Sequence, residues 1–141
     1  MCFILCVIPA EAGIRNKSSG QVIAGKWRTL LKSSPNSGDT FIEEPAFYDS
    51  GIYEAWNPRV SFTDPATQDN ILVWEQHYNS NGAEIYGRKN VSGEWQDIIP
   101  ISSLDNKDSA EPDLATYNGN TYVGWQDYES GNWLIKVQTI N

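Results

Sequence analysis

The stretch "NTYVGWQDYESGNWLIKV" (residues 120–137) repeats, about fifty residues later, the pattern of "NILVWEQHYNSNGAEIYG" (residues 70–87). Both stretches run from an aliphatic segment through a tryptophan to a turn rich in Ser, Asn and Gly. The matched positions are Trp74 and Trp125, Tyr78 and Tyr128 after a one-residue gap, and Ile85 and Ile135. A repeat at this spacing predicts structural units that stack on one another.

The repeat extends beyond this pair. "GKWRTLLKSS" (residues 25–34) matches "GEWQDIIPISS" (residues 93–103) at the Gly, the Trp, the two aliphatic residues and the Ser-Ser. A Glu-Pro follows each, at Pro45 and Pro112. Four short strands in roughly fifty residues are typical of a β-propeller blade, which must stack on a neighbour to bury its face. We therefore predict an all-β fold of antiparallel four-stranded blades, forming an incomplete propeller of about two blades.

Short strands alternate with turn clusters along the chain. Strands are predicted at 70–75, 121–125 and 134–140, because Val, Ile, Thr and aromatic residues dominate there. Turns are predicted at 79–82, 91–94, 118–120 and 129–132, where Asn and Gly can supply the positive φ of tight hairpins. No window keeps a helical apolar period for more than two turns.

Composition limits the function classes. The chain has 141 residues, of which 40% are hydrophobic, so a folded domain is expected. Its formal net charge of -8 includes no basic stripe, which argues against a nucleic-acid partner. Acidic, aromatic-rich composition fits a secreted or cell-surface β-protein.

Residues 1–19 differ from the rest and are predicted to be a disordered leader. The apolar run Cys2–Ile8 and the small-x-small site at residues 10–12 suit a signal peptide, but no basic residues precede the run. Spurious translation from a misplaced start codon is the alternative. The run is too short to span a membrane. Since both cysteines lie here, the remaining chain contains no disulfide.

The predicted domain, residues 20–141, has unequal parts. An outer strand is expected at 25–33, and blade repeats at about 58–102 and 111–141. An inserted aromatic hairpin, 46–57, lies between them if Pro58 is the counterpart of Pro112. If Pro45 begins the innermost strand instead, Pro58 belongs to a loop.

The segments "GNTYVGWQDYESGNWLIKV" and "DNILVWEQHYNSNGAEIYGRKNVSGEW" resemble blades of the sialidase-like (BNR, or Asp-box) β-propellers, over about residues 20–141. In that family the turn before the fourth strand carries Ser-x-Asp-x-Gly-x-Thr-Trp. Residues 88–95 keep the Trp of this box, while Asn90 replaces the Asp. The resemblance implies propeller architecture and says little about chemistry.

Sialidase activity would require three arginines that hold the substrate carboxylate, a Tyr nucleophile supported by a Glu, and an Asp that acts as the acid. The chain has four arginines, of which Arg15 lies in the leader and Arg28 in an expected outer strand. The remaining pair, Arg59 and Arg88, cannot form a triad, and the Arg-Ile-Pro motif is absent. We therefore expect a non-catalytic module; a remnant or C-terminal fragment of a sialidase-like glycoside hydrolase is the alternative.

A glycan or protein ligand is expected at one rim of the propeller, where insertions project. The candidate ligand-binding residues are Tyr53, Trp56, Arg59, His77, Tyr128 and Trp133. His77 is the sole histidine, so no multi-histidine metal site is available. No cofactor is predicted. Calcium is an alternative at the acidic run 103–113, although the run lacks the order of a known calcium loop.

The ends of the predicted repeat are halves of one blade, since it begins with a fourth strand and stops after a third. Two blades curve too little to close a ring. Closure therefore calls for either a homotrimer, in which each copy donates residues 25–33 to its neighbour, or the remaining blades of a longer chain.

Overall fold

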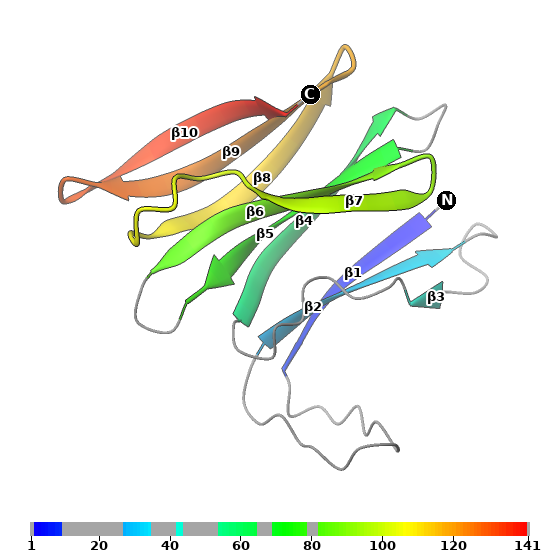
Figure 1. The fold of residues 1–141 in the computed structure, drawn as a ribbon, viewed down its shortest axis with the longest axis horizontal. Helices are drawn as coiled ribbons and strands as arrows, with labels where there is room; N and C mark the ends of the chain where they lie inside the picture. The colour runs from blue at the N-terminus through cyan, green and yellow to red at the C-terminus, as the bar shows by residue number, and fades with distance from the viewer. Residues whose placement is uncertain are drawn as a thin grey trace.

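The computed structural model describes residues 2–9, 27–34, 42–43, 54–64, 69–78 and 82–140, and every regular element in these ranges is a β-strand (Figure 1). The strands are β1 (Cys2–Pro9), β2 (Trp27–Ser34), β3 (Ile42–Glu43), β4 (Glu54–Asp64), β5 (Asp69–His77), β6 (Ala83–Val91), β7 (Glu94–Pro100), β8 (Ser109–Tyr117), β9 (Asn120–Glu129) and β10 (Asn132–Ile140).

The strands form three antiparallel sheets. We name them the N-terminal sheet (β1-β2-β3), the middle sheet (β4-β5-β6-β7) and the C-terminal sheet (β10-β9-β8). In the last two sheets each strand pairs with the next one along the chain, as in consecutive hairpins (Figure 1). The predicted all-β, antiparallel class is therefore confirmed. The described residues do not form a closed ring of sheets.

Three hairpins turn on two residues with positive φ. The φ values are 53° and 88° at Ser92 and Gly93, 50° and 75° at Asn118 and Gly119, and 50° and 85° at Ser130 and Gly131. Positive φ at both central residues matches the right-handed twist of the paired strands. The predicted turns are confirmed here, although Ser rather than Asn takes the first position in two of them.

The turn between β6 and β7 lies in residues 88–95, the segment compared with an Asp-box in the sequence. The Asn90 side-chain oxygen accepts a hydrogen bond from the Gly93 N–H at 3.0 Å, and Asp69 Oδ1 accepts one from the Ser92 N–H at 2.8 Å. Asn90 thus supplies a side-chain acceptor to a backbone donor of the turn, as Asn and Asp commonly do.

Strand register places the repeated residues at equivalent positions in the middle and C-terminal sheets, which we call the two copies of the repeat. The equivalent cross-strand pairs are Trp74–Tyr86 and Trp125–Lys136, Glu75–Ile85 and Gln126–Ile135, and His77–Ala83 and Tyr128–Trp133. The predicted match of Ile85 with Ile135 is confirmed. The match of Tyr78 with Tyr128 is wrong, because the extra residue of the first copy lies in the β5–β6 turn and not in the strand.

Both copies carry a bulge before a proline in their first strand. The ladder of β4 shifts at Asn57-Pro58, and that of β8 shifts at Glu111-Pro112. The residue before each proline has positive φ, 47° at Asn57 and 55° at Glu111. A proline cannot donate to the ladder, so an irregular position suits it. Pro58 and Pro112 therefore hold equivalent positions at the two bulges, and Pro45 lies outside the described residues.

Strand ends differ slightly from the predicted boundaries. β4 begins at Glu54, inside the segment 46–57 predicted as an inserted hairpin, and the rest of that segment lies outside the described residues. β8 begins at Ser109 rather than at residue 111. β2, Trp27–Ser34, overlaps the predicted outer strand 25–33.

The main core lies between the middle and C-terminal sheets. It consists of Ile71, Val73, Ile85, Ile101, Val123, Trp125 and Ile140, with Leu114 packed against it. Ile71, Val73, Ile85 and Val123 have no exposed surface. Strand residues alternate between faces, so this cluster uses one face of each sheet.

A second cluster occupies the opposite face of the middle sheet. Ala55, Leu72 and Trp74 are buried there, and Val60, Tyr86, Trp95 and Ile98 pack around them. Trp74 retains only 2% of its exposed surface. Both repeated tryptophans are therefore buried, Trp125 between the middle and C-terminal sheets and Trp74 on the opposite face of the middle sheet.

β1 pairs with β2 along its whole length, from Cys2 opposite Ser34 to Pro9 opposite Trp27. The sequence predicts a disordered leader over 1–19, and the structure differs from this for residues 2–9. Apolar and β-branched residues favour strands, and pairing satisfies the backbone groups of the segment. Residues 10–19 lie outside the described residues. β1 and β2 lie beside β4 (Figure 1).

Candidate functional site

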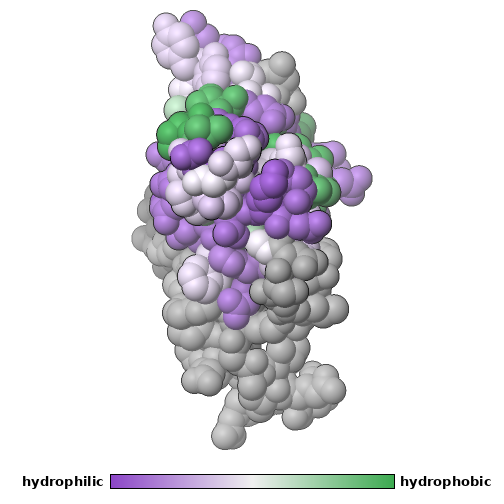
Figure 2. Space-filling view, turned by 90° about the vertical axis from the view of Figure 1, so that its left-hand side faces the viewer, coloured by the Kyte–Doolittle hydropathy of each residue, from purple (hydrophilic) through white to green (hydrophobic). Residues whose placement is uncertain are grey.

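A groove of about 670 Å³ opens where the hairpin ends of the middle and C-terminal sheets meet. Its lining comes from the β5–β6 hairpin, the loop before β8 and the β9–β10 hairpin. The lining residues are His77, Gly82, Asn106, Lys107, Asp108, Tyr128, Ser130 and Gly131. Figure 2 shows this end of the molecule: hydrophilic residues cover its middle, and hydrophobic residues gather above them, at the level of the C-terminal sheet.

Two aromatic pairs involve the ring-bearing residues of the groove. The Trp56 ring lies 4.7 Å from the His77 ring, centroid to centroid, and the Tyr128 ring lies 5.3 Å from the Trp133 ring. His77 and Tyr128 hold equivalent positions in the two copies. Trp56 is 37% exposed and Trp133 is 51% exposed, so both pairs present ring surface to solvent.

Glu75 anchors the first of these pairs. It is buried, and its carboxylate binds the His77 Nε2 atom. Its Oε2 atom also accepts hydrogen bonds from the Asn57 side chain at 3.0 Å and from the Glu111 N–H at 3.1 Å. Asn57 and Glu111 are the positive-φ residues of the two bulges. One carboxylate therefore ties the bulge of the middle sheet to that of the C-terminal sheet.

The contacts of Glu75 determine its ionisation. Burial by itself raises the pKa of the Glu75 carboxyl group. The hydrogen bonds from His77, Glu111 and Asn57 stabilise the charged form and outweigh burial, so the pKa lies below its ordinary value. Glu75 is thus a charged structural group with its acceptor sites engaged.

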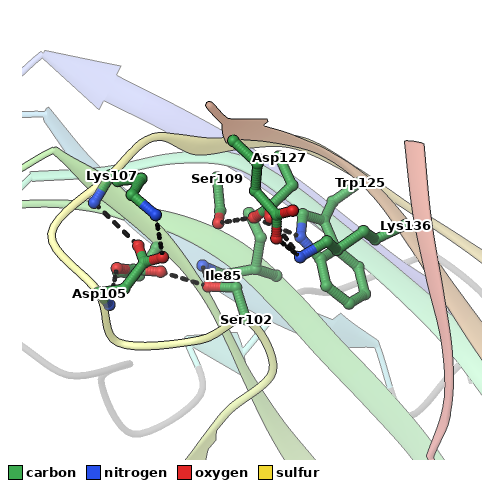
Figure 3. Close-up of polar contacts among 10 residues, drawn as sticks. Ile85, Ser102, Asp105, Lys107, Ser109, Trp125, Asp127 and Lys136 are labelled. Atoms are coloured by element: carbon green, nitrogen blue, oxygen red, sulfur yellow. Dashed lines mark hydrogen bonds and ion pairs between the residues drawn. The ribbon is translucent and has the colours of Figure 1, made fainter. Parts of the chain in front are cut away.

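A polar network holds the loop that forms one wall of the groove (Figure 3). The Ser102 hydroxyl donates to Glu84 at 2.5 Å and accepts from the Ile85 N–H at 2.9 Å. The Asp105 N–H donates to the other oxygen of Glu84 at 3.2 Å. Burial raises the pKa of Glu84, and the hydrogen bonds from Ser102 and Asp105 offset this only in part.

The same loop approaches the β5–β6 hairpin closely. Asp108 Oδ1 accepts a hydrogen bond from the Ala83 N–H at 3.1 Å. Gly82 has a φ of 79°, and a β-carbon at this position would lie 2.8 Å from the Lys107 carbonyl oxygen. Only glycine fits this approach without strain, because it lacks the β-carbon and tolerates positive φ.

The C-terminal sheet has its own polar cluster beside the groove (Figure 3). Asp127 accepts hydrogen bonds from Ser109 at 2.6 Å and from the Trp125 indole at 3.2 Å, and it pairs with Lys136 at 2.6 Å. Burial pushes the pKa of Asp127 upward, but these contacts outweigh it and the pKa is lowered. Asp127 and Glu129 raise the pKa of Lys136.

The middle sheet repeats this arrangement with an amide in place of the acid. Trp74 donates to Gln76 at 3.1 Å, as Trp125 donates to Asp127. Gln76 in turn donates to the Glu54 carbonyl at 3.2 Å. A tryptophan bonded to an acceptor two residues later is therefore part of the repeated unit.

The predicted site residues fall into three groups. His77 and Tyr128 line the groove, and Trp56 and Trp133 lie against them. Arg59 is separate: its guanidinium lies 3.7 Å from Asp113 and donates to the Pro58 carbonyl at 3.1 Å. Tyr53 lies outside the described residues. Asn106, Lys107 and Asp108 also line the groove. They belong to the run 103–113, which the sequence suggested only as an alternative calcium site, because this loop reaches the groove through the stacking of two sheets.

The acidic run 103–113 is engaged with protein donors. Asp105 pairs with Lys107 at 3.0 Å, and Asp113 accepts from the Leu114 N–H at 2.9 Å. Among the described residues, no group of three or more His, Cys, Asp or Glu side chains is arranged to hold a metal ion. The part of the chain that the structure describes also has no helix long and apolar enough to cross a membrane.

Fold and site together define an all-β protein of stacked antiparallel sheets with a polar, aromatic-flanked groove at one hairpin end. No protein-family model matches the chain, and neither a curated protein nor a solved structure matches it.

Proposed function

We propose that this chain is a non-catalytic, extracellular binding module built from β-propeller blades, with the middle and C-terminal sheets as two consecutive blades. The observation that carries the proposal is the head-to-tail arrangement of two equivalent sheets. Trp125 faces the middle sheet, and its counterpart Trp74 lies on the face of the middle sheet turned away from the C-terminal sheet. Both units thus point their tryptophan in the same direction along the stack, as successive blades do.

The exposed face of the C-terminal sheet supports the same reading. Tyr117, Tyr128, Trp133, Ile135 and Val137 lie on the face of the C-terminal sheet opposite Trp125, which we call the open face. Ile135 is 75% exposed, whereas its counterpart Ile85 is completely buried by the C-terminal sheet. Val137 is 66% exposed. In the middle sheet, the equivalent face is covered by the C-terminal sheet. The open face is therefore the face on which a further blade would pack.

We place ligand binding at the groove, and a glycan fits it best. Exposed aromatic rings offer stacking surface, while the loop supplies both donors and acceptors close by. The groove also lies between two sheets, where loops of successive blades converge. Catalysis is not part of the proposal, because the buried carboxylates Glu75 and Asp127 are held by structural hydrogen bonds.

A glycan array followed by titration of the strongest hit tests this proposal. Tyr128→Ala and Trp133→Ala should each weaken binding roughly tenfold, which corresponds to about 1.4 kcal/mol, because each removes one ring of the same pair. Tyr117→Ala is the matched control. Tyr117 is 69% exposed on the same sheet but does not line the groove, so affinity should stay unchanged. Absence of any binding, or equal affinity in the Tyr128 variant, would contradict the proposal.

A further inference from the structure

The C-terminal sheet has one strand fewer than its counterpart. In the middle sheet the third strand, β6, pairs on its outer side with β7. β10 is the equivalent of β6, and among the described strands it pairs only with β9. The outer edge of β10 therefore presents backbone donors and acceptors where the other copy has a fourth strand.

The chain contains a second strand of the β7 type. Trp27 to Leu31 in β2 matches Trp95 to Ile99 in β7, residue for residue, as Trp, two polar residues and two aliphatic residues. Figure 1 shows β2 in the N-terminal sheet, at the opposite end of the molecule from β10. β2 thus has the sequence pattern of β7, the fourth strand of the middle sheet, but lies outside the two repeated sheets.

β1 covers one edge of β2 along its whole length. Leu31 lies opposite Leu5 of β1, and the equivalent Ile99 lies opposite Gly87 of β6. Leu30 lies opposite Cys6 in the same way that Ile98 lies opposite Arg88. Gly87 of β6 corresponds to Val137 of β10, so a β2 strand that pairs with β10 in the register of the middle sheet would place Leu31 opposite Val137. β3 pairs with β2 only at Lys32 and Ser33, so over Trp27 to Leu31 the edge of β2 that is covered is the one that pairs with β1.

We infer that the outer edge of β10 is a docking site for β2 of a second copy of this chain, and that β1 blocks the exchange by covering the same edge of β2. In the register of the middle sheet, Val137 of one copy would lie opposite Leu31 of the other. The inference rests on the proposed repeat architecture, but it does not depend on the ligand groove.

The composition of the two outer strands supports this assignment. β7, the outer strand of the middle sheet, carries Glu94, Asp97 and Pro100, and charges and proline protect a free edge from pairing. β10 has a single charged residue, Lys136, and no proline. Lys136 is already paired with Asp127 and Glu129. The edge of β10 therefore lacks the features that prevent strand addition.

A synthetic peptide of residues 25–34, labelled with a fluorophore, provides the direct test on the full chain. Anisotropy should rise and saturate as the protein is added, because the peptide supplies the missing strand without displacing β1. Val137→Lys should weaken binding at least tenfold, since it places a charge on the edge strand. Val137 is exposed, so the thermal transition should be unchanged; Thr139→Lys, also exposed on β10, replaces it if the transition falls.

Two controls locate the site. Tyr117→Lys adds the same charge to the open face on β8, on the other side of the sheet from the outer edge of β10, and should leave peptide affinity unchanged. A peptide with Leu31→Pro should not bind, because proline cannot donate to the ladder. Failure of the folded chain to bind the peptide, or binding that survives both Val137→Lys and Thr139→Lys, overturns the inference.

Release of β2 should produce self-association. Light scattering on the full chain should give one 15.8 kDa protomer, whereas Leu5→Pro, which disrupts β1, should give larger species that Val137→Lys abolishes. A Leu5→Pro variant that stays monomeric at every concentration contradicts the role assigned to β1. If these experiments fail while glycan binding is observed, the inference about strand exchange is wrong. The proposed binding function is then unaffected.

Discussion

Trp74→Ala is expected to lower the free energy of unfolding by about 3–5 kcal/mol, the usual cost of replacing a buried tryptophan by alanine. Trp74 is 2% exposed, packs with Leu72 and Ala55, and stacks near Tyr86 at a centroid distance of 6.2 Å. Its indole also donates to Gln76, so the substitution removes a buried hydrogen bond together with the packing.

Trp125→Ala should cost a similar amount, because Trp125 holds the equivalent position and is 6% exposed. Trp56→Ala serves as the matched control. Trp56 is 37% exposed, so its loss should cost far less while weakening any ligand that stacks in the groove. Guanidinium unfolding followed by circular dichroism measures all three. Equal losses at the three positions would show that Trp56 belongs to the core and not to the site.

Glu75→Ala should destabilise the protein by about 2–4 kcal/mol, because it removes a buried acceptor and leaves part-buried donors without their partner. The affected donors are the Asn57 side chain and the Glu111 N–H. Gln126→Ala is the matched control, since Gln126 holds the equivalent position on the open face and is exposed. That variant should unfold within about 0.5 kcal/mol of the parent, the usual range for a surface substitution.

The Glu75 contribution should also depend on pH. Its pKa is lowered in the folded protein, so its stabilising effect is fully present above the unfolded value of 4.5 and is lost as the pH falls through the folded value. Glu84 has a raised pKa and acts in the opposite sense, with a contribution that grows as the pH falls. The stability difference between the parent and Glu75→Gln isolates the first effect. A difference that stays constant from pH 7 to pH 3 would contradict the assignment.

Much of the fold follows from local sequence patterns. Turn residues such as Asn118-Gly119, alternating strands and paired tryptophans each act over a few residues, so the hairpins and the equivalent cores could be predicted. Repetition then placed Ile85 and Ile135 at equivalent positions without knowledge of the packing.

The site was less predictable because it depends on contacts between sheets. Glu75 looks like an ordinary polar residue of a strand, and its partners Asn57 and Glu111 belong to two other strands in two different sheets. The one-residue error at Tyr78 has a similar origin, since only the ladder shows where the longer turn absorbs its extra residue. The pairing of β1 with β2 is a long-range contact that no local pattern in residues 2–9 encodes.

The central claim is that the middle and C-terminal sheets are equivalent units, and that the face covered in the middle sheet is exposed in the C-terminal sheet. Guanidinium unfolding of Ile85→Ala and Ile135→Ala tests it most directly, because the two variants make the same change at equivalent positions. Ile85→Ala should lose about 2–5 kcal/mol, as expected for a buried isoleucine, and Ile135→Ala should lose less than about 0.5 kcal/mol, as expected at the surface. Equal losses, or a larger loss at Ile135, would contradict the account.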